Sequence, residues 1–167
     1  MITGEKELRK LYPDLDENQY QPSGIDLTLN HISKIKHRNK TTYGLLQNKK
    51  LLPNLEKQET TEVEIEEDTF NVYQLQPHTS YIATTNEKIK IPKQSGQFYL
   101  PRSSLLRAGI DVRTAFGDPG FNGHLSFLII NHTDYPFIIE ENTRFAQLIN
   151  MGAENVEVEY DGDYQEK

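Results

Sequence analysis

The sequence contains no cysteine among its 167 residues. Without thiols the chain has no disulfide framework, no thiolate zinc site and no cysteine nucleophile. Its histidines are His31, His37, His78, His124 and His132, and no two of them show a ligand spacing such as a pair on one helical turn. We therefore expect no metal site made by protein side chains, and stability that comes from packing or from assembly.

The sequence is also short of positive charge and of long hydrophobic runs. Its formal net charge is -7, whereas broad binding to a nucleic-acid backbone needs an extended basic face. No apolar run reaches the ~18 residues that a membrane span requires, and the start MITGEKELRK lacks the apolar core of a signal peptide. We expect a soluble, cytoplasmic protein whose partners are neither nucleic acid nor membrane. A small anionic ligand can still be held by a local cluster.

The length predicts one domain, residues 1–167, which is long enough to bury a real core. Hydrophobic residues make up 35% of the chain and charged residues 26%. This balance is slightly polar for a globular protein, so we expect some segments to be solvated loops or tails.

Short alternating segments dominate the chain. Only GEKELRKLY predicts a helix, with Leu8 and Leu11 three residues apart and Pro13 at its end. The stretch from His37 to about Leu55 is polar and rich in lysine, and it predicts a long loop or irregular insertion. Strands are predicted in QPSGIDLTL, TEVEIEED, YIATTNEKIKIP, GQFYLP, GHLSFLIIN, YPFIIEENTRFAQLI and NVEVEYDGDY. Many short strands with tight turns predict an all-β barrel or jelly roll.

The stretch PRSSLLRAGI concentrates hydrogen-bond donors. Arg102 and Arg107 carry rigid, permanently charged forks, and Ser103 and Ser104 add hydroxyl and backbone donors. Together these groups suit several phosphate oxygens at once, and a triphosphate is the natural ligand. The alternative is that two arginines and two serines near a turn are solvated surface groups and helix caps. The stretch alone does not decide between the two.

A second candidate is the glycine-rich stretch TAFGDPGFNGHLSF. Asp118 lies in a turn and could accept a proton from water as a general base, while Phe121, three residues later, could stack on a sugar or base. The alternative is a plain hairpin, because Asp-Pro-Gly is ordinary turn chemistry.

Three further polar residues lie in strand patterns. Asp26 is either solvated or, if buried near a site, able to hold an arginine in place. Arg144 and Gln147 lie on an otherwise apolar strand, where they either decorate a sheet edge or contact phosphate or a neighbouring subunit. The acidic tail EVEYDGDYQEK is a frayed terminus or, through its tyrosines, a flap over a ligand.

The order of these segments is more specific than any one of them. QPSGIDLTL, PRSSLLRAGI, DPGFNGHLSFLIIN, RFAQLI and a terminal YDGDYQ together resemble the dUTPase and dCTP deaminase superfamily. The resemblance runs from about Gln21 to Gln165 and is poor only from His37 to Glu67. It implies a distorted jelly-roll β fold of the β-clip type with a short N-terminal helix, assembled as a homotrimer with active sites between subunits.

The resemblance also implies a role for each candidate. In the superfamily an arginine and serine motif cradles the triphosphate, and the corresponding residues here are Arg102, Ser103, Ser104 and Arg107. Its aspartate and the following aromatic residue fall on Asp118 and Phe121. Gln147 and Tyr164 are further expected nucleotide contacts, with Asp26 and Arg144 in support. Members of the superfamily use Mg²⁺ carried by the triphosphate, so no dedicated protein cage is needed.

The two chemistries of the superfamily differ in one side chain. Deamination needs a group that moves a proton from water to the ring, and the deaminases supply a glutamate ten residues after the aspartate. Leu128 fills that position here, and leucine cannot transfer a proton. Hydrolysis of dUTP to dUMP and pyrophosphate requires only charge stabilisation, alignment and Asp118 acting on the attacking water. The sequence is therefore most similar to archaeal-type dUTP diphosphatases with a deaminase-like framework.

The sequence departs from the superfamily pattern in its tail. It ends in YDGDYQEK rather than in a glycine-rich arm, and Asp163 stands where deaminases have a lysine, so one phosphate contact is lost. Two other functions stay open from the sequence. One is a dCTP deaminase or bifunctional deaminase and dUTPase, in which His124 would replace the glutamate. The other is a catalytically silent nucleotide-binding regulatory protein.

Overall fold

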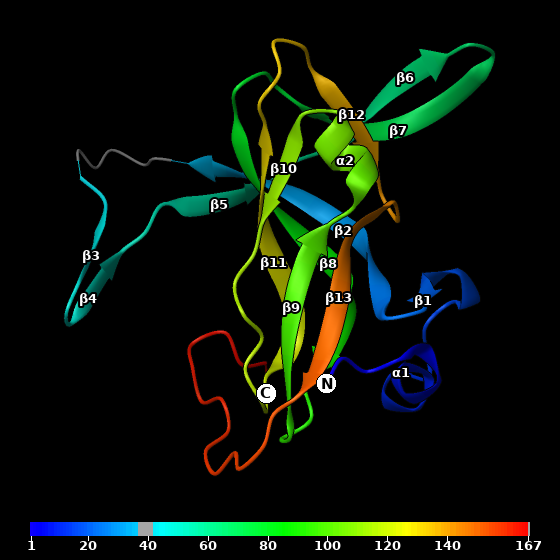
Figure 1. Cartoon of the computed structure of the whole chain (residues 1–167). Helices are drawn as coiled ribbons and strands as arrows, with labels where there is room; N and C mark the ends of the chain where they lie inside the picture. Colours follow the sequence, from blue (N-terminus) through cyan, green and yellow to red (C-terminus); the bar gives the residue numbers. More distant parts are fainter. Residues whose placement is uncertain (37–41, 167) are drawn as a thin grey trace.

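The computed structural model describes residues 1–36 and 42–166, and these residues are mostly strand (Figure 1). The first helix, α1 (Glu5–Leu11), forms where the sequence predicts it, with Leu8 fully buried. The 3₁₀ helix η1 (Glu17–Gln19) then leads into the short strand β1 (Tyr20–Gln21) and the long strand β2 (Gly24–Lys36). No helix in the described ranges combines the length and the apolar character that crossing a membrane demands.

A single eight-stranded sheet carries most of the core. Its strand order is β10-β11-β8-β2-β13-β9, and β1 and β5 also pair with β2. The other strands of this sheet are β5 (Asn54–Lys57), β8 (Ser80–Lys90), β9 (Ser95–Pro101), β10 (Ile110–Arg113), β11 (Asn122–Asn131) and β13 (Arg144–Gly152). Every pairing between them is antiparallel.

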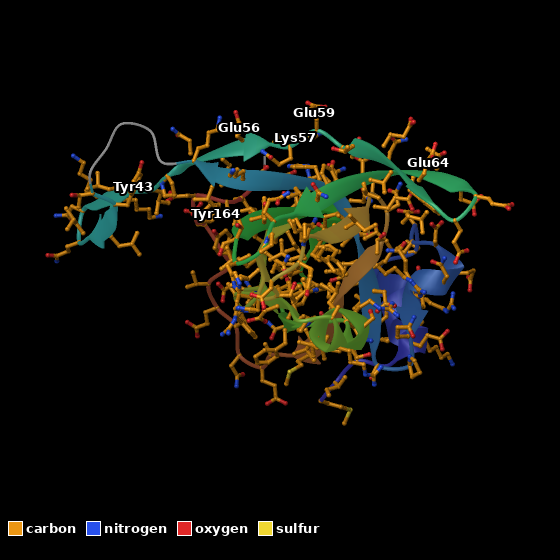
Figure 2. All side chains as sticks on the ribbon, turned by 90° about the horizontal axis from the view of Figure 1, so that it is seen from above. Tyr43, Glu56, Lys57, Glu59, Glu64 and Tyr164 are labelled. Atoms are coloured by element: carbon orange, nitrogen blue, oxygen red, sulfur yellow. The ribbon has the colours of Figure 1, made fainter. Side chains whose placement is uncertain are left out.

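Two smaller sheets project from this body in Figure 1. One has the order β12-β7-β6 and is built from β6 (Thr61–Ile65), β7 (Asp68–Leu75) and β12 (Phe137–Glu140). The other is the hairpin of β3 (Gly44–Leu46) and β4 (Lys49–Leu51), which we call the β3–β4 arm and define as residues 42–53. Figure 2 shows the arm, with Tyr43 on it, extending well away from the body.

Alternation sets the buried face of each central strand. On β2 the side chains of Ile25, Leu27 and Leu29 are fully buried, as the period-2 pattern requires. Ile89 of β8 and Phe145 of β13 join the same core. The prediction of an all-β, distorted jelly-roll fold with a short N-terminal helix is confirmed by this arrangement.

Three local predictions are wrong. GEKELRKLY is not the sole helix, because Ser103–Arg107 form a second one, α2, which is too short to show helical periodicity. The segment from His37 to about Leu55 is not an irregular loop in its described part, 42–55, because it contains β3, β4 and the start of β5; residues 37–41 lie outside the described residues. NVEVEYDGDY is not a strand: its Val158 is 83% exposed, and no neighbouring strand pairs with it.

Candidate functional site

The helix α2 begins where β9 ends, and this junction positions the arginine and serine motif. Arg102 keeps an extended backbone and precedes the helix, and its carbonyl accepts the first helical hydrogen bond, from the amide of Leu105 (3.0 Å). Ser103 and Ser104 are exposed and open the helix, so their amides have no acceptor within it. Leu105 is buried and anchors the helix to the core.

A buried carboxylate holds the arginines of this region in place. The side chain of Asp26 is only 4% exposed, and its Oδ2 forms ion pairs with Nη1 of Arg102 and, at 3.4 Å, with Nη1 of Arg144. Arg144 also donates to the carbonyl of Asn18 (2.8 Å). Burial raises the pKa of the Asp26 carboxyl and outweighs the two guanidinium charges, which lower it.

The other predicted phosphate contacts lie around this carboxylate. Gln147 stands directly opposite Asp26 across the β13–β2 pairing, so both side chains leave the sheet on the same face. Arg107 is exposed in the last turn of α2 and has no ion-pair partner within the described ranges. We call the predicted residues gathered here the arginine cluster: Asp26, Arg102, Ser103, Ser104, Arg107, Arg144 and Gln147.

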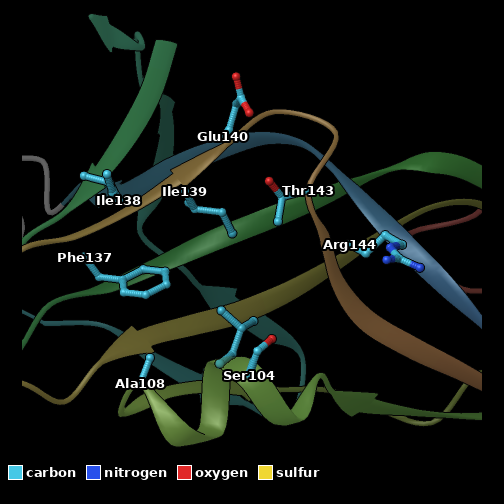
Figure 3. A pocket seen from close by; sticks show the side chains of 9 residues that line it. Ser104, Ala108, Phe137, Ile138, Ile139, Glu140, Thr143 and Arg144 are labelled. Atoms are coloured by element: carbon cyan, nitrogen blue, oxygen red, sulfur yellow. The ribbon is translucent and has the colours of Figure 1, made fainter. Parts of the chain in front are cut away.

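Two pockets adjoin the arginine cluster, one on each side of Arg144. The first has a volume of about 350 Å³ and lies between α2 and β12, with Ser104 and Arg144 at its edge and Phe137 and Ile138 in its wall (Figure 3). The second, of about 570 Å³, is more polar and includes Glu87.

Beneath the second pocket lies a buried polar network that the sequence analysis missed. Glu87 accepts hydrogen bonds from the amide and hydroxyl of Thr28 and from Nε2 of Gln19 (2.7 Å). The same Gln19 amide also donates to the carbonyl of Asp26 (2.9 Å), so the network supports the strand that carries the central carboxylate. No sequence signal marks it, because Gln19 and Glu87 are 68 residues apart.

Asp118 lies in a tight turn at the opposite end of β9. The amide of Phe121 donates to the carbonyl of Asp118 (3.2 Å), with Pro119 and Gly120 between them. The φ of Gly120 is 86°, which a type II turn requires at this position and which favours glycine. Asp118 is exposed, and its carboxylate has no hydrogen-bond or ion-pair partner within the parts of the chain described.

A buried polar group, also missed by the sequence analysis, lies behind this turn. Gln97 is fully buried, donates to Oη of Tyr12 (2.6 Å) and accepts from Oη of Tyr99 (2.8 Å). Burial raises the pKa of Tyr12 to about 12. Burial also raises the pKa of Tyr99, and the Tyr12 hydroxyl and the Asp118 carboxylate add to that rise. The Tyr99 hydroxyl lies beside Gly117, the residue before Asp118, because a Cβ on Gly117 would be 2.3 Å from it.

The C-terminal tail, residues 153–166, folds back onto the Asp118 turn. The amide of Tyr160 donates to the carbonyl of Pro119 (2.8 Å), and its ring packs edge-on against Phe121 with centroids 5.6 Å apart. The Gln165 carboxamide accepts from the amide of Asn122 (3.0 Å) and donates to the carbonyl of Gly120 (3.1 Å). Phe121 is thus packed between the core and the tail. We call the turn, residues 117–124, the Asp118 hairpin.

Within one chain, the arginine cluster and the Asp118 hairpin are separated. Gly117 bridges Gln97, five residues before Arg102 on the same extended segment. At ~3.3 Å per strand residue the two groups lie about 16 Å apart. The structure therefore brings the predicted phosphate contacts together, but it leaves Asp118, Phe121 and Tyr164 elsewhere.

An exposed apolar surface covers the space between these two groups. Phe98 and Leu100 of β9 are 49% and 52% exposed, and Ile149 stands directly opposite Phe98 on β13. Phe116 packs edge-on against Phe98 with ring centroids 5.0 Å apart. Gly96 makes this possible, since a Cβ there would lie 2.4 Å from Cζ of Phe116. We call Phe98, Leu100, Phe116 and Ile149 the β9 patch.

Comparison with known proteins places this geometry in a family. Residues 2–151 match the dCTP deaminase-like family. A protein of Methanopyrus kandleri named probable deoxyuridine 5'-triphosphate nucleotidohydrolase is 41% identical over 164 residues, which is 98% of this chain and 99% of that protein. A deoxyuridine 5'-triphosphate nucleotidohydrolase of Methanocaldococcus jannaschii is 30% identical over 165 residues, 99% of either chain.

A solved structure supports the same assignment at the level of the fold. The 2'-deoxycytidine 5'-triphosphate deaminase of Agrobacterium tumefaciens superposes with a TM-score of 0.64 at 21% identity, over 89% of this chain and 47% of that chain. The match over residues 2–151 and the relatives aligned along their whole length show that the chain belongs to the dCTP deaminase-like family.

Proposed function

We propose that this chain is a dUTP diphosphatase, which hydrolyses dUTP to dUMP and pyrophosphate. The observation that carries the proposal is Leu128, an aliphatic side chain where the deaminases of the superfamily have their proton-transferring glutamate. The full-length similarity to proteins named deoxyuridine 5'-triphosphate nucleotidohydrolase supports the same activity. We further propose that residues 1–167 form a single dUTPase-like domain that works in the cytoplasm.

The surroundings of Leu128 support this choice. Leu128 lies on β11, and the residues directly opposite it are Ile82 of β8 and Arg113 of β10. Neither can accept a proton from water at neutral pH, because one side chain is a hydrocarbon and the other is a permanent cation. His124, on the same strand, has its Nδ1 3.1 Å from the carbonyl of Thr85, which fixes its ring against the neighbouring strand.

The arginine cluster is the proposed binding site for the triphosphate. Arg102 and Arg107 would neutralise phosphate oxygens, and the hydroxyls and amides of Ser103 and Ser104 would donate neutral hydrogen bonds. Asp26 would keep Arg102 and Arg144 in one orientation before the ligand arrives, which lowers the entropic cost of binding. Gln147, on the same sheet face as Asp26, would add a further contact.

Asp118 is the proposed catalytic residue. Its carboxylate would orient a water molecule toward the α-phosphorus and accept the proton that the water loses. As the new oxygen–phosphorus bond forms, the bond from the α-phosphorus to the bridging oxygen breaks, and pyrophosphate leaves with that electron pair. Phe121 and Tyr164 would contact the nucleotide from the hairpin and from the tail.

Mg²⁺ would enter with the triphosphate as part of the substrate. No group of three or more histidine, aspartate or glutamate side chains is arranged to hold a metal ion in residues 1–36 and 42–166. A triphosphate with its own Mg²⁺ brings the charge compensation that the leaving pyrophosphate needs.

We also propose that the active form is a homotrimer with shared active sites. Asp118 and Arg102 lie at opposite ends of β9 in one chain, so one chain alone cannot place both on one triphosphate. The β9 patch between them is apolar and exposed, as expected of a surface that another copy covers. A second copy packed there could bring its Asp118 hairpin to the arginine cluster of the first.

The activity is tested with a panel of dUTP, dCTP, dTTP and UTP in Mg²⁺, with the products separated by chromatography. We expect dUMP and pyrophosphate from dUTP, and no release of ammonia from dCTP. Rapid deamination of dCTP would favour the deaminase, with His124 as its proton-transferring group. Tight binding of dUTP without pyrophosphate release would favour the silent regulatory protein.

Asp118→Asn should lower kcat for dUTP by about a hundredfold or more, the usual contribution of a general base. Its affinity for dUTP should stay near that of the parent, because the amide keeps the size of the carboxylate and the arginine cluster is intact. Steady-state kinetics and equilibrium binding measure the two effects. Asp68→Asn, an exposed carboxylate on β7, is the control. Unchanged turnover in Asp118→Asn would remove Asp118 from the chemistry.

Arg102→Ala should weaken dUTP binding by about tenfold or more, since a charge-assisted hydrogen bond to phosphate is lost and Asp26 loses a partner. Binding of dUMP should change much less, because the Arg102 guanidinium would bind the outer phosphates, which dUMP lacks. Calorimetric titration with both nucleotides measures the difference. Lys36→Ala, an exposed cation paired with Glu56, is the control. Equal losses for dUTP and dUMP would contradict the proposed role.

Phe98→Glu should dissociate the assembly, because it places a charge in the middle of the β9 patch. Light scattering should then show a single chain where the parent shows three. Hydrolysis of dUTP should fall on the order of a hundredfold, as when the general base is removed. Tyr135→Glu, between β11 and β12 and 77% exposed, is the control. Full activity in a monomeric Phe98→Glu variant would rule out shared sites.

A further inference from the structure

The β3–β4 arm is attached to the body by few strand contacts. Its two strands pair only with each other among the described strands, and Gln47 and Asn48 form the turn between them. Leu45 and Leu46 are 73% and 61% exposed, so the arm has no apolar core of its own. Its position relative to the body must therefore depend on contacts made by individual side chains.

One such contact joins the arm to the C-terminal tail. Nζ of Lys50 on β4 forms an ion pair and hydrogen bond with Oδ2 of Asp163, and it lies 5.9 Å from the centre of the Tyr164 ring. Hydrogen bonding to Lys50 lowers the pKa of Asp163 and raises that of Lys50. Figures 1 and 2 both place the tail on the side of the body from which the arm extends, and Figure 2 shows Tyr164 there.

This ion pair acts on the middle of a segment that is fixed at both ends. Upstream, Tyr160 is bonded through its amide to Pro119. Downstream, the amide of Glu166 donates to the carbonyl of Asn122 (2.9 Å), and its carboxylate accepts from the amide of His124 (2.8 Å) and pairs with Lys88 (3.2 Å). Between these attachments, residues 161–164 are exposed, and Lys50 contacts two of them, Asp163 and Tyr164, from outside the tail.

The neighbouring lysine shows that charge alone does not produce this contact. Lys49 precedes Lys50 on β4 and is exposed, but it has no ion-pair partner within the described residues. Adjacent strand residues point to opposite faces, so the register of the β3–β4 hairpin decides which lysine faces the tail. The arm thus presents Lys50, and not Lys49, to Asp163 beside Tyr164.

We propose that Lys50 is a positioning residue for the hydrolysis of dUTP. Through Asp163, the β3–β4 arm holds the tail against the Asp118 hairpin and sets Tyr164 in place for the nucleotide. The inference rests on the proposed function, because it gives the arm and the tail a task in that reaction. It adds to the site a segment that the resemblance in sequence does not cover.

The solvent exposure of the Lys50–Asp163 ion pair limits how much its loss can change tail closure. The side chains of Lys50 and Asp163 are 55% and 71% exposed, so solvent screens the pair and its loss should change tail closure by up to about fivefold. Closure precedes the chemical step and would affect the bound substrate and the transition state alike. Loss of the pair should therefore raise KM for dUTP and leave kcat nearly unchanged.

The test combines charge reversal with removal of the partner charge. Lys50→Glu and Asp163→Asn should each raise KM for dUTP by up to about fivefold with kcat within about twofold of the parent. When Asp163→Asn is already present, adding Lys50→Glu should raise KM no further, because the partner of Lys50 is gone. Lys49→Glu, which changes the charge by the same amount on the same strand, should behave like the parent.

Hydrogen exchange in the absence of nucleotide gives a second readout. The amides of Tyr160, Asn122, His124 and Glu166 are bonded between tail and hairpin, and they should exchange up to about fivefold faster in Lys50→Glu and in Asp163→Asn, and no faster in the double variant than in Asp163→Asn. Equal exchange in Lys50→Glu and Lys49→Glu, or faster exchange in the double variant than in Asp163→Asn, would overturn the inference. A parent protein that does not cleave dUTP would refute the proposed function, while the exchange data would still decide whether Lys50 holds the tail.

Discussion

The arrangement of the site depends on one buried carboxylate. Asp26 lies on β2, and its carboxylate forms ion pairs with two arginines from other parts of the chain. Arg102 precedes α2, and Arg144 is the first residue of β13. The carboxylate is almost fully buried, whereas both arginines remain about one-third exposed. Each guanidinium therefore has one side held by Asp26 and other N–H donors that face solvent. In the proposed triphosphate site, these donors are in this way held in place before any ligand arrives.

Burying Asp26 has a cost that the rest of the structure offsets. Its carboxyl loses solvent, which raises its pKa, and the two arginines act in the opposite direction. Its backbone carbonyl is bonded to Gln19, which is itself held by the buried Glu87. The polar groups around Asp26 are thus joined in one connected hydrogen-bond network, which makes this part of β2 rigid. The chemistry proposed for Asp118 needs the opposite, an exposed carboxylate with open access for water.

Much of the fold could be predicted from short-range patterns, and the residues of the candidate site could be predicted from the order of their motifs, but their grouping in space could not. The alternation of Ile25, Leu27 and Leu29 predicts β2 correctly, because one face of that strand is wholly buried. The helix α2 has five residues and the strands of the arm have three, so neither is long enough for a period to appear. In the tail, Val156 and Val158 alternate as in a strand, but neither lies in a strand of the described chain.

The contacts of these candidate residues were harder to predict, because the partners are distant in sequence. Asp26 is 76 residues from Arg102 and 118 from Arg144, and no local pattern distinguishes it from a solvated aspartate. The pairing of Lys50 with Asp163 spans 113 residues and starts in a segment without clear periodicity. By contrast, the turn around Asp118 was recognisable, since Asp-Pro-Gly fixes its own geometry.

The contact between Gly96 and Phe116 limits which substitutions this surface can accept. The ring of Phe116 occupies the volume that any larger residue at position 96 would need. A side chain at position 96 would therefore require this half-exposed ring to turn away. In a related protein that has such a side chain, the edge-on contact with Phe98 would be lost as well. We expect substitutions at position 96 to be accompanied by changes at position 116.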